Sequence, residues 1–335
     1  MSLTDRDDVC HADGLDTTWD CIVVGGGAAG LSAALVLGRA RKRTLVVDAG
    51  EPSNLPAHGI GGLLGHDGRP PAALYAGGRE ELAAYPSVEV RADVVVGGER
   101  VDGGFVLELA GEGHERARRV LLATGMEYRP PELPGVAELW GRAVFHCPFC
   151  HGWEVRDRPL AVLDSGDSGV HRALLLRNWS EDVVLLTNGA TDLEAADRDR
   201  LAGAGIAVDE RPVERLVGHD GELDAVVFAD GDRLERSGLL VPAPLHQRSD
   251  LAEQLGAAAG EASPVVVDPV GIDAKYATSA PGVFAAGDLS TQMPQVAGAI
   301  AAGSLAAATV VQSLVFDEDG ATYPPGAPTA ALPAS

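Results

Sequence analysis

The sequence predicts an α/β fold with two Rossmann-like three-layer domains, because a short apolar strand, a turn of small residues, a helical segment and a further apolar strand follow one another twice. The first series starts with a strand at residues 21–24 and the second with a strand at residues 160–163. A pair of cysteines, Cys147 and Cys150, lies between the two series. At 335 residues, the chain is long enough to give each domain a substantial core.

Composition and charge describe an ordinary globular chain, with 46% hydrophobic and 22% charged residues. A formal net charge of -23 at pH 7 repels phosphate backbones and anionic lipid, so we expect neither nucleic acid nor a membrane as a partner. Residues 1–18 carry aspartates where a signal peptide would carry lysine or arginine, and no apolar run of some 18 residues occurs. We therefore expect a cytoplasmic protein with a flexible acidic leader at residues 1–18 and a flexible tail at residues 319–335.

The first series has the pattern of a dinucleotide site. Its strand is followed by G-x-G-x-x-G at residues 25–30 and by a helical run at residues 31–37. In this motif the first glycine permits a tight turn, the second lets a pyrophosphate approach the backbone, and the third lets the helix pack on the strand. A second strand, residues 44–47, ends in an aspartate that can bind ribose hydroxyls, which disfavours the alternative of a merely glycine-rich loop. The candidate contacts are Gly25, Gly27, Ala28, Ala29, Gly30 and Asp48.

The segment at residues 50–71 is predicted to be a loop, because it is rich in glycine, proline and asparagine. Long loops often carry function, so Asn54 and His58 are candidate cofactor contacts, with an ordinary surface histidine as the alternative for His58. We then expect a helix at residues 74–85, strands at residues 88–90, 94–96, 105–109 and 120–122, and a turn at residues 123–125. Prolines 130, 131 and 134 mark the crossover into a second domain.

The cysteine pair lies in the stretch Phe-His-Cys-Pro-Phe-Cys-His-Gly-Trp-Glu at residues 145–154. Two thiols separated by two residues can close a tight disulfide, and the amides of a helix that begins there would stabilise a thiolate at the first position. Cys147 would then be the attacking thiol and Cys150 the resolving one. We therefore favour a redox centre, with His146 and His151 beside it.

The spacing of the cysteine pair is compatible with three alternatives to a redox centre. Half of a zinc site needs a second pair of ligands, whereas Cys10 and Cys21 stand alone and the two histidines adjoin the thiols too closely for a four-ligand cage. The pattern C-x-x-C-H is also the attachment signature of c-type haem, which requires export. Two buried structural cysteines are the third alternative.

The second series is a degraded copy of the first. After the strand at residues 160–163, the turn at residues 164–169 replaces the glycine loop, and a helix at residues 170–178 and a strand at residues 182–187 follow. Asp164 stands where the first series has Gly25, so its side chain crowds the turn and its charge would face a pyrophosphate. We therefore predict a disabled nicotinamide site; the alternative is that Asp164 turns aside and a nicotinamide cofactor binds.

The C-terminal part of the chain supplies further candidate contacts. We expect strands at residues 265–267 and 283–286, and the second of these leads to Asp288, whose carboxylate could accept hydrogen bonds from ribityl hydroxyls. A helix of small residues, about 294–314, would carry Gln295 and Val296 on its first turn. Amides at that helix end would stabilise negative charge on a reduced isoalloxazine.

From Trp19 to about Leu314 the chain resembles the low-molecular-weight thioredoxin reductase family of FAD enzymes. The resemblance rests on four motifs, at residues 25–30, Ala123-Thr124-Gly125, residues 147–150 and residues 281–288. It implies bound FAD, contacted also by Ala123 and Gly125, and a homodimer. It further implies an FAD-binding domain formed by residues 19–127 and 262–318, with a central domain at residues 128–261 that holds Cys150 over the flavin and Cys147 toward the substrate.

The chain departs from that family at His151 and Asp164. Its stretch Cys-Pro-x-Cys-His-Gly-Trp-Glu at residues 147–154, together with residues 48–54, resembles instead the branch that includes the gliotoxin and holomycin dithiol oxidases. This resemblance implies an enzyme that oxidises a small-molecule dithiol of natural-product biosynthesis to a cyclic disulfide, with O2 as acceptor and H2O2 as product. A neutral imidazole can take a thiol proton near pH 7, so His151 is the candidate base and His146 the reserve. The alternatives are an NADPH-dependent thioredoxin-disulfide reductase and a non-catalytic redox sensor or metal-binding module.

Overall fold

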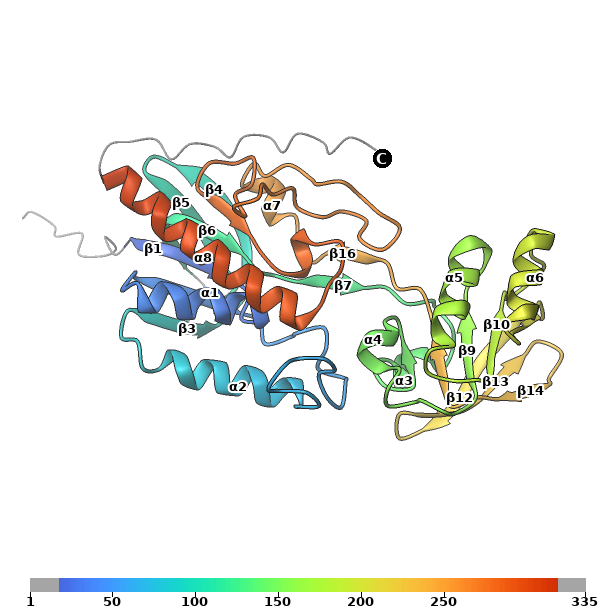
Figure 1. Cartoon of the computed structure of the whole chain (residues 1–335). Coiled ribbons are helices and arrows are strands. Elements are labelled where there is room, and N and C mark those ends of the chain that lie inside the picture. The colour runs from blue at the N-terminus through green and yellow to red at the C-terminus, as the bar shows by residue number, and fades with distance from the viewer. Residues whose placement is uncertain (1–17, 112, 319–335) are drawn as a thin grey trace, which may run out of the picture.

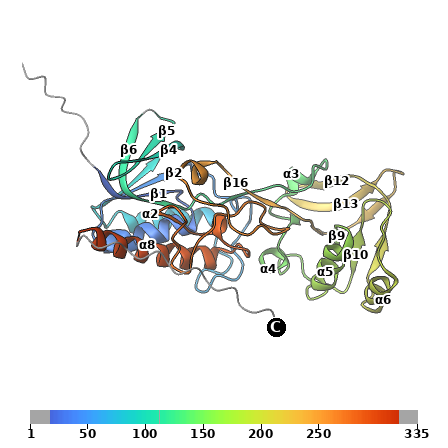
Figure 2. The same cartoon turned by 90° about the horizontal axis from the view of Figure 1, so that it is seen from above.

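The computed structural model describes residues 18–111 and 113–318, which form two α/β units (Figure 1). The predicted leader and tail lie outside these ranges, apart from Thr18. Two antiparallel strands, β7 (Met126–Tyr128) and β16 (Leu245–Gln247), connect the units, which lie side by side in both Figure 1 and Figure 2. The chain therefore crosses from the first unit to the second and returns.

The first unit is built on a seven-stranded sheet. Its parallel part has the order β3-β2-β1-β6-β17, and β4 and β5 continue from β6 as an antiparallel meander. The strands are β1 (Trp19–Val24), β2 (Thr44–Asp48), β3 (Val88–Ala92), β4 (Val95–Val101), β5 (Gly104–Leu109), β6 (His114–Leu122) and β17 (Val283–Ala285). Since β17 lies far along the chain, both ends of the described sequence contribute to this sheet.

Three helices, α1 (Ala28–Arg39), α2 (Pro71–Leu82) and α8 (Val296–Glu318), pack on one face of that sheet. The side chains alternate along β1, so that Cys21 and Val23 face these helices while Ile22 and Val24 face the meander and the short helix α7 (Leu251–Gln254). The unit thus has three layers, as the sequence predicts.

The second unit has a five-stranded parallel sheet in the order β11-β10-β9-β15-β8. Its strands are β8 (Val144–Phe145), β9 (Leu160–Leu163), β10 (Val183–Leu186), β11 (Ala207–Asp209) and β15 (Gly238–Leu240). One face is covered by α5 (Gly166–Leu176) and α6 (Ala195–Gly203), and the other by the antiparallel strands β12 (Val213–His219), β13 (Glu222–Phe228) and β14 (Arg233–Glu235). Both units are therefore Rossmann-like, and the predicted fold class is confirmed.

Some predicted boundaries are wrong. The segment at residues 265–267 is not a strand, because it forms only one isolated bridge, between Val266 and Leu245, and the side chains of Val265 and Val267 remain 38% and 40% exposed. Helix α5 begins at Gly166 instead of residue 170. Helix α8 begins at Val296, so Gln295 directly precedes it and accepts the amide of Ala299 on its carbonyl (2.8 Å).

The expectation of no long apolar run is wrong for helix α8, which contains a 21-residue stretch, Val296–Phe316, that is long and apolar enough to cross a membrane, with a mean hydropathy of 1.8. In this fold it is a core helix. It packs so closely on α1 that a Cβ atom at Gly303 would lie 2.0 Å from the carbonyl oxygen of Ala29, and its residues Ala306 and Val310 are fully buried. Its apolar character is thus accounted for in part by packing.

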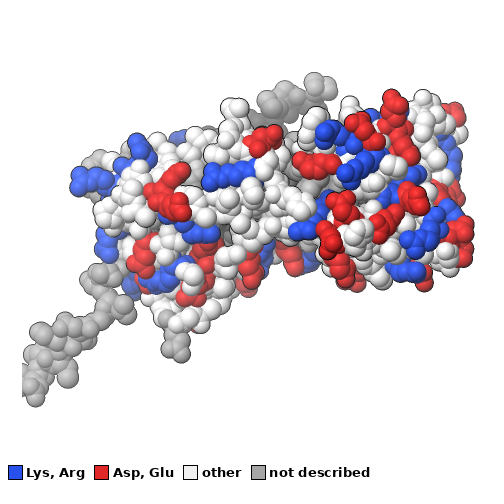
Figure 3. Space-filling view, turned by 90° about the horizontal axis from the view of Figure 1, so that it is seen from below, with Lys and Arg blue, Asp and Glu red and all other residues white. Residues whose placement is uncertain are grey.

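The surface of the second unit carries mixed charge. On the face shown in Figure 3, arginine side chains lie among aspartate and glutamate side chains over this unit, and a broad uncharged area lies toward the first unit. No continuous basic surface is visible among the described residues on that face.

Candidate active site

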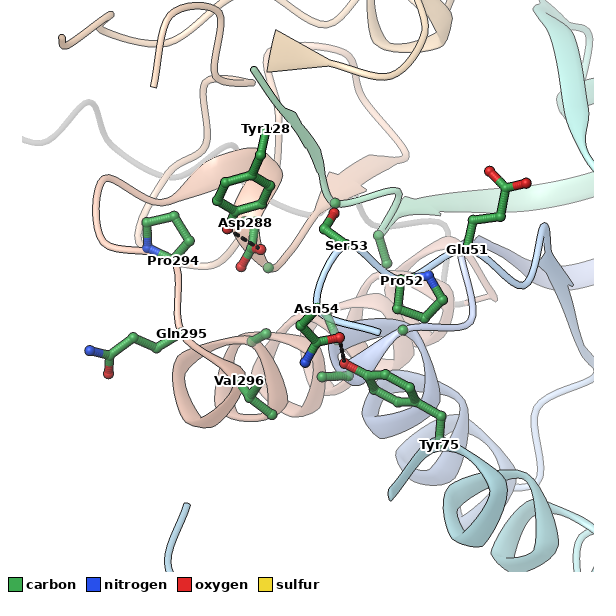
Figure 4. Close-up of a pocket in the computed structure, with 18 of the residues that line it drawn as sticks. Glu51, Pro52, Ser53, Asn54, Tyr75, Tyr128, Asp288, Pro294, Gln295 and Val296 are labelled. Carbon is green, nitrogen blue, oxygen red and sulfur yellow. Dashed lines mark hydrogen bonds between the residues drawn. The ribbon is translucent and has the colours of Figure 1, made fainter. Parts of the chain in front are cut away.

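A cavity of about 670 Å³ lies where the two units meet. Its walls come from the carboxyl ends of β1, β2 and β6, from the loop that follows β2, from the segment that leads into α8, and from the thiol-bearing turn of the second unit. Binding sites of α/β sheets lie at such carboxyl ends. Figure 4 shows part of this wall, with Asn54, Tyr128 and Asp288 among the labelled side chains.

The glycine motif has a distinct geometry at each of its three glycines. Gly25 has a φ of +109°, and a Cβ atom there would lie 2.3 Å from the carbonyl oxygen of Ala123. A Cβ atom at Gly30 would lie 1.8 Å from the carbonyl oxygen of Gly25, whereas one at Gly27 would meet nothing within 4 Å. The turn and the helix packing therefore require glycine at the first and third positions, and Gly27 leaves bare backbone facing the cavity.

Asp48 is held in place at the rim of the cavity. Its Oδ1 accepts the amides of Gly26 (3.3 Å) and Gly50 (3.0 Å), and its Oδ2 pairs with Nη1 of Arg79 (3.1 Å). The carboxylate lies beside the start of α1, whose amides form an anion-binding end. This arrangement fits a ribose and a pyrophosphate.

At the other end of the cavity the Tyr128 hydroxyl donates to Oδ2 of Asp288 (3.3 Å; Figure 4). Burial raises the pKa of the Asp288 carboxyl, although the hydrogen bond from Tyr128 and the charge of Arg248 oppose that rise. Nearby, the Tyr75 hydroxyl donates to Oδ1 of Asn54 (2.9 Å). These groups offer a buried polar surface next to the start of α8.

The residues present fit FAD at this cavity, since backbone free of side chains, a helix N-terminus and a fixed carboxylate stand in the order that a dinucleotide requires. The predicted contacts that line it are Gly25, Gly27, Ala28, Ala29, Asp48, Asn54, Ala123, Gly125, Asp288, Gln295 and Val296. Gly30 lies beneath it as a packing residue. His58 does not line the cavity: its neighbours Ala57 and Gly59 do, while His58 itself is exposed, so its contact with a cofactor stays a prediction without support from this geometry.

Sequence patterns do not reveal several lining residues. Tyr75, Tyr128, Trp140 and Arg248 belong to no motif, and Ser53 lies in the stretch at residues 48–54 without being predicted as a contact; they meet only because segments far apart in the chain fold together. Ser53 adjoins the predicted Asn54 within the loop, and this adjacency is the single local signal.

The two thiols lie close together on a single helical turn, α4 (Pro148–His151), that begins directly after Cys147. Sγ of Cys150 donates to Sγ of Cys147 at 2.8 Å. This hydrogen bond, together with the amides of Cys150 and Phe149, lowers the pKa of Cys147 to about 7. The same bond and burial raise the pKa of Cys150. Cys147 is therefore the thiolate of the pair, and it is stabilised by local donors because a four-residue helix has little macrodipole.

The two sulfur atoms also differ in what they face. Cys150 lines the cavity, whereas Cys147 is not among the lining residues. The loop of the first unit comes so close to this turn that a Cβ atom at Gly61 would lie 3.0 Å from the carbonyl oxygen of Cys150. The contact fixes the thiol turn against the cavity of the first unit.

The two histidines beside the thiols have different surroundings. Nε2 of His151 donates to the carbonyl oxygen of Gly141 (3.1 Å), so Nδ1 of the neutral ring is an acceptor, and this buried atom has no hydrogen-bond partner among the described residues. Burial lowers the pKa of His151, and it lowers the pKa of His146 to about 4. The ring of His146 packs against Tyr128 and Trp140, with centroids 4.6 Å and 5.7 Å away. His151 alone thus combines a fixed tautomer with an unused basic nitrogen.

In the second unit, the carboxylate of Asp164 lies within the turn at residues 164–169 that replaces the glycine loop. Oδ1 of Asp164 accepts the amide of Ser165 (2.8 Å), and Oδ2 accepts the hydroxyl of Ser168 (2.8 Å) and pairs with Arg172. The carboxylate therefore lies at the N-terminus of α5, where a nucleotide phosphate would bind in an intact site. At the end of β10, Oδ1 of Asn188 accepts the amide of Val213 (2.7 Å).

Other cysteine chemistry has little structural basis in the described part of the chain. No three His, Cys, Asp or Glu side chains gather there as a metal site. Cys21 is fully buried in β1, and burial raises the pKa of its thiol, so this cysteine behaves as an apolar core residue.

Comparisons with known proteins agree with this architecture. Residues 19–303 match the pyridine nucleotide-disulphide oxidoreductase family. The thioredoxin reductase tcpT of Claviceps purpurea is 32% identical over 90% of this chain and 96% of its own. Among solved structures, HlmI is 38% identical with a TM-score of 0.83, covering 91% of this chain and 95% of its own. An oxidoreductase from Agrobacterium tumefaciens is 37% identical with a TM-score of 0.84, covering 89% and 99%. The predicted resemblance is confirmed, and the chain belongs to the pyridine nucleotide-disulphide oxidoreductase family.

Proposed function

We propose that the protein is an FAD-dependent oxidase that closes a small-molecule dithiol into an intramolecular disulfide, with O2 as electron acceptor and H2O2 as product. The observation that carries this proposal is the Asp164 carboxylate at the N-terminus of α5, which fills the place of a nicotinamide phosphate. Because the nicotinamide site is blocked in this way, the flavin would receive its electrons from the thiol pair and not from NADPH. Dithiol plus O2 then balances against cyclic disulfide plus H2O2.

In this proposal FAD is held by the glycine motif, by Asp48 and by the Asp288 end of the cavity. When bound, the flavin would supply the two-electron link between the thiol pair and dioxygen. The position of Cys150 on the cavity wall supports this direction of transfer, and Cys147, which does not line the cavity, remains for the substrate.

The reaction of the thiols follows from their unequal acidities. A substrate thiolate attacks Sγ of Cys147 in the oxidised pair and releases Sγ of Cys150. The second substrate thiolate then attacks the substrate sulfur and releases Cys147. Because the pKa of Cys147 is lowered to about 7, Cys147 is the better leaving group of the pair in this second displacement. Nδ1 of His151 would take the proton of the attacking thiol.

Anaerobic reduction of the flavin tests the proposal. The yellow flavin is expected to bleach when a dithiol such as dihydrolipoamide is added and to stay yellow with excess NADPH. Admitting air after the dithiol should restore the colour and yield one peroxide per disulfide. Rapid bleaching by NADPH, with none by any dithiol, would reject the oxidase.

An NADPH-dependent thioredoxin-disulfide reductase is the second candidate, and the name of the tcpT relative favours it. Such an enzyme would run the same thiol relay in reverse. It predicts NADPH bleaching and NADPH-dependent reduction of thioredoxin, so the anaerobic experiment separates the two activities.

Substituting Asp164 probes the closed nucleotide site directly. Asp164→Gly should empty the N-terminus of α5 and free Arg172 to contact a phosphate, so NADPH should bleach the flavin of this variant at a measurable rate. Asp164→Asn removes the charge but keeps a side chain in the turn. NADPH should therefore bleach the flavin of this variant more slowly than that of Asp164→Gly. If neither variant responds to NADPH, Asp164 is not what excludes the nucleotide.

We also propose that the protein is a cytoplasmic homodimer. Helix α8 exposes apolar side chains on its outer face, among them Leu305 (55% exposed) and Val315 (44%), and a second copy could cover them. Light scattering is expected to give twice the mass of one chain. The double variant Leu305→Glu, Val315→Glu should give the mass of one chain. A dimer that is unchanged in this variant would show that the copies meet elsewhere.

A further inference from the structure

A second cavity, of about 420 Å³, opens beside the one assigned to FAD. Its lining residues are Ser53, Glu127, Tyr128, Trp140 and Arg248. All of them except Glu127 also line the first cavity, so the two spaces share a wall. Glu127 and Tyr128 belong to β7, and Arg248 directly follows β16, so this space lies on the paired connecting strands between the two units.

Two hydrogen bonds fix the orientation of the Arg248 side chain at the wall that the two cavities share. Its Nη2 donates to Oγ of Ser53 (2.8 Å) and its Nε donates to the carbonyl oxygen of Met126 (3.4 Å). Oγ of Ser53 in turn donates to the same carbonyl oxygen (2.7 Å). No carboxylate of the described residues forms an ion pair with Arg248. A guanidinium has five N–H donors, so several remain for a ligand.

Glu127, the acidic residue that lines this cavity, already forms an ion pair. Oε2 of Glu127 accepts Nη2 (2.6 Å) and Nε (2.8 Å) of Arg129. Arg248 is therefore a positively charged donor that forms no ion pair with a described carboxylate, although its charge acts on Asp288 in the adjoining cavity. Such a group binds a carbonyl or carboxylate oxygen.

Aromatic rings connect this cavity to the thiol pair. Tyr128 and Trp140 line it, and the ring of His146 packs against both of them. His146 directly precedes Cys147 in the chain. A molecule of a few carbon atoms that lies on these rings, with its oxygen at Arg248, would thus have its other end near the reactive sulfurs.

We propose that this second cavity binds the non-reacting part of the substrate, and that Arg248 donates hydrogen bonds to a carbonyl or carboxylate oxygen of a small dithiol. The inference rests on the proposed dithiol oxidase and names a feature of its substrates. Arg248 is a substrate-binding residue in this scheme and takes no part in the sulfur chemistry.

Three 1,3-dithiols that close the same five-membered ring test this assignment. Propane-1,3-dithiol has no oxygen, dihydrolipoamide has a neutral carbonyl, and dihydrolipoate has a carboxylate. Oxygen uptake is measured with wild type, Arg248→Met, Arg248→Lys and, as a charge-matched control, Arg215→Met in β12 of the second unit, where the arginine is exposed.

Arg248→Met is expected to lower kcat/KM about 10- to 100-fold for the dithiol that carries the recognised oxygen and less than about twofold for propane-1,3-dithiol. A loss for dihydrolipoate alone identifies a carboxylate, and an equal loss for dihydrolipoamide identifies a carbonyl. Arg248→Lys should lose less, because it keeps a charged donor. Arg215→Met should match wild type with all three.

Equal effects of Arg248→Met on all three dithiols, or none, would overturn the assignment, as would loss of bound flavin from this variant. If wild type consumes no oxygen with any dithiol, the proposed function fails, and calorimetric titration of lipoamide and lipoate still tests the cavity. Weaker binding of either compound to Arg248→Met than to wild type supports the site, whereas equal affinity, or no binding to wild type, rejects it.

Discussion

Replacing Cys147 or Cys150 with serine is expected to abolish dithiol oxidation, lowering turnover by roughly 10⁴-fold or more, because the relay loses a sulfur that forms and breaks bonds. Both variants should still contain yellow flavin, since neither cysteine belongs to the glycine motif or to the Asp48 region. Oxygen uptake and the flavin absorbance of the purified variants measure the two properties. Sustained oxidation in either variant would remove the thiol relay from the mechanism.

The pKa of Cys147 gives this prediction a second, independent measurement. Its folded-state value, lowered to about 7, means that the thiolate dominates above pH 7 and is lost as the pH falls through that value. The rate of alkylation of reduced wild type by iodoacetamide should therefore rise with a midpoint near pH 7. Cys150→Ala removes the donor to Cys147 and should move the midpoint upward, so that alkylation at pH 7 slows about tenfold for each pH unit. Cys150→Ser keeps a hydroxyl donor and should move it less.

Replacing His151 with glutamine is expected to slow cyclic disulfide formation by about 100-fold or more, in the range that a general base contributes. A glutamine amide can keep the hydrogen bond to the Gly141 carbonyl oxygen that Nε2 now makes, while it lacks the basic nitrogen at the position of Nδ1. The variant thus separates the base from the packing of the ring. His146→Gln, at the reserve position, should have a smaller effect.

The pH dependence distinguishes a base from a structural residue. Burial lowers the pKa of His151, so its imidazole stays neutral and able to accept a proton below pH 6.5, and wild type should keep its rate there. In His151→Gln the substrate must ionise by itself, so the rate should climb about tenfold per pH unit toward the pKa of the substrate thiol. Parallel pH profiles of variant and wild type would leave His151 without a role as base.

Local backbone chemistry determines how much of this structure could be predicted from the sequence. The strand and helix around the glycine motif follow from short-range patterns, and the steric needs of Gly25 and Gly30 arise within one turn. The unequal acidity of Cys147 and Cys150 also arises within one turn. The roles of the glycine-motif residues in binding FAD remain predictions.

Features that depend on distant segments could not be predicted in this way. Three consecutive valines at residues 265–267 resemble a buried strand, yet they form only one isolated bridge, between Val266 and Leu245 of β16. Arg248 and Trp140 line the cavity only because the two units pack side by side. The hydrophobic periodicity of the sequence carries no information about this packing. The start of α5 is marked less clearly in the sequence than the start of α1, because Asp164 replaces the first of the three motif glycines while Gly166 and Gly169 remain.

The interactions of the Asp164 carboxylate with Ser168 and Arg172 would have a metabolic consequence in the proposed oxidase. A flavoenzyme that hands electrons to oxygen would, if it also accepted NADPH, consume the cell's reductant in a futile cycle and release hydrogen peroxide continuously. In the proposed oxidase, the Asp164 carboxylate would insulate the flavin from that pool. Oxygen consumption would then be tied to the supply of the dithiol, and the enzyme would be silent whenever its substrate is absent.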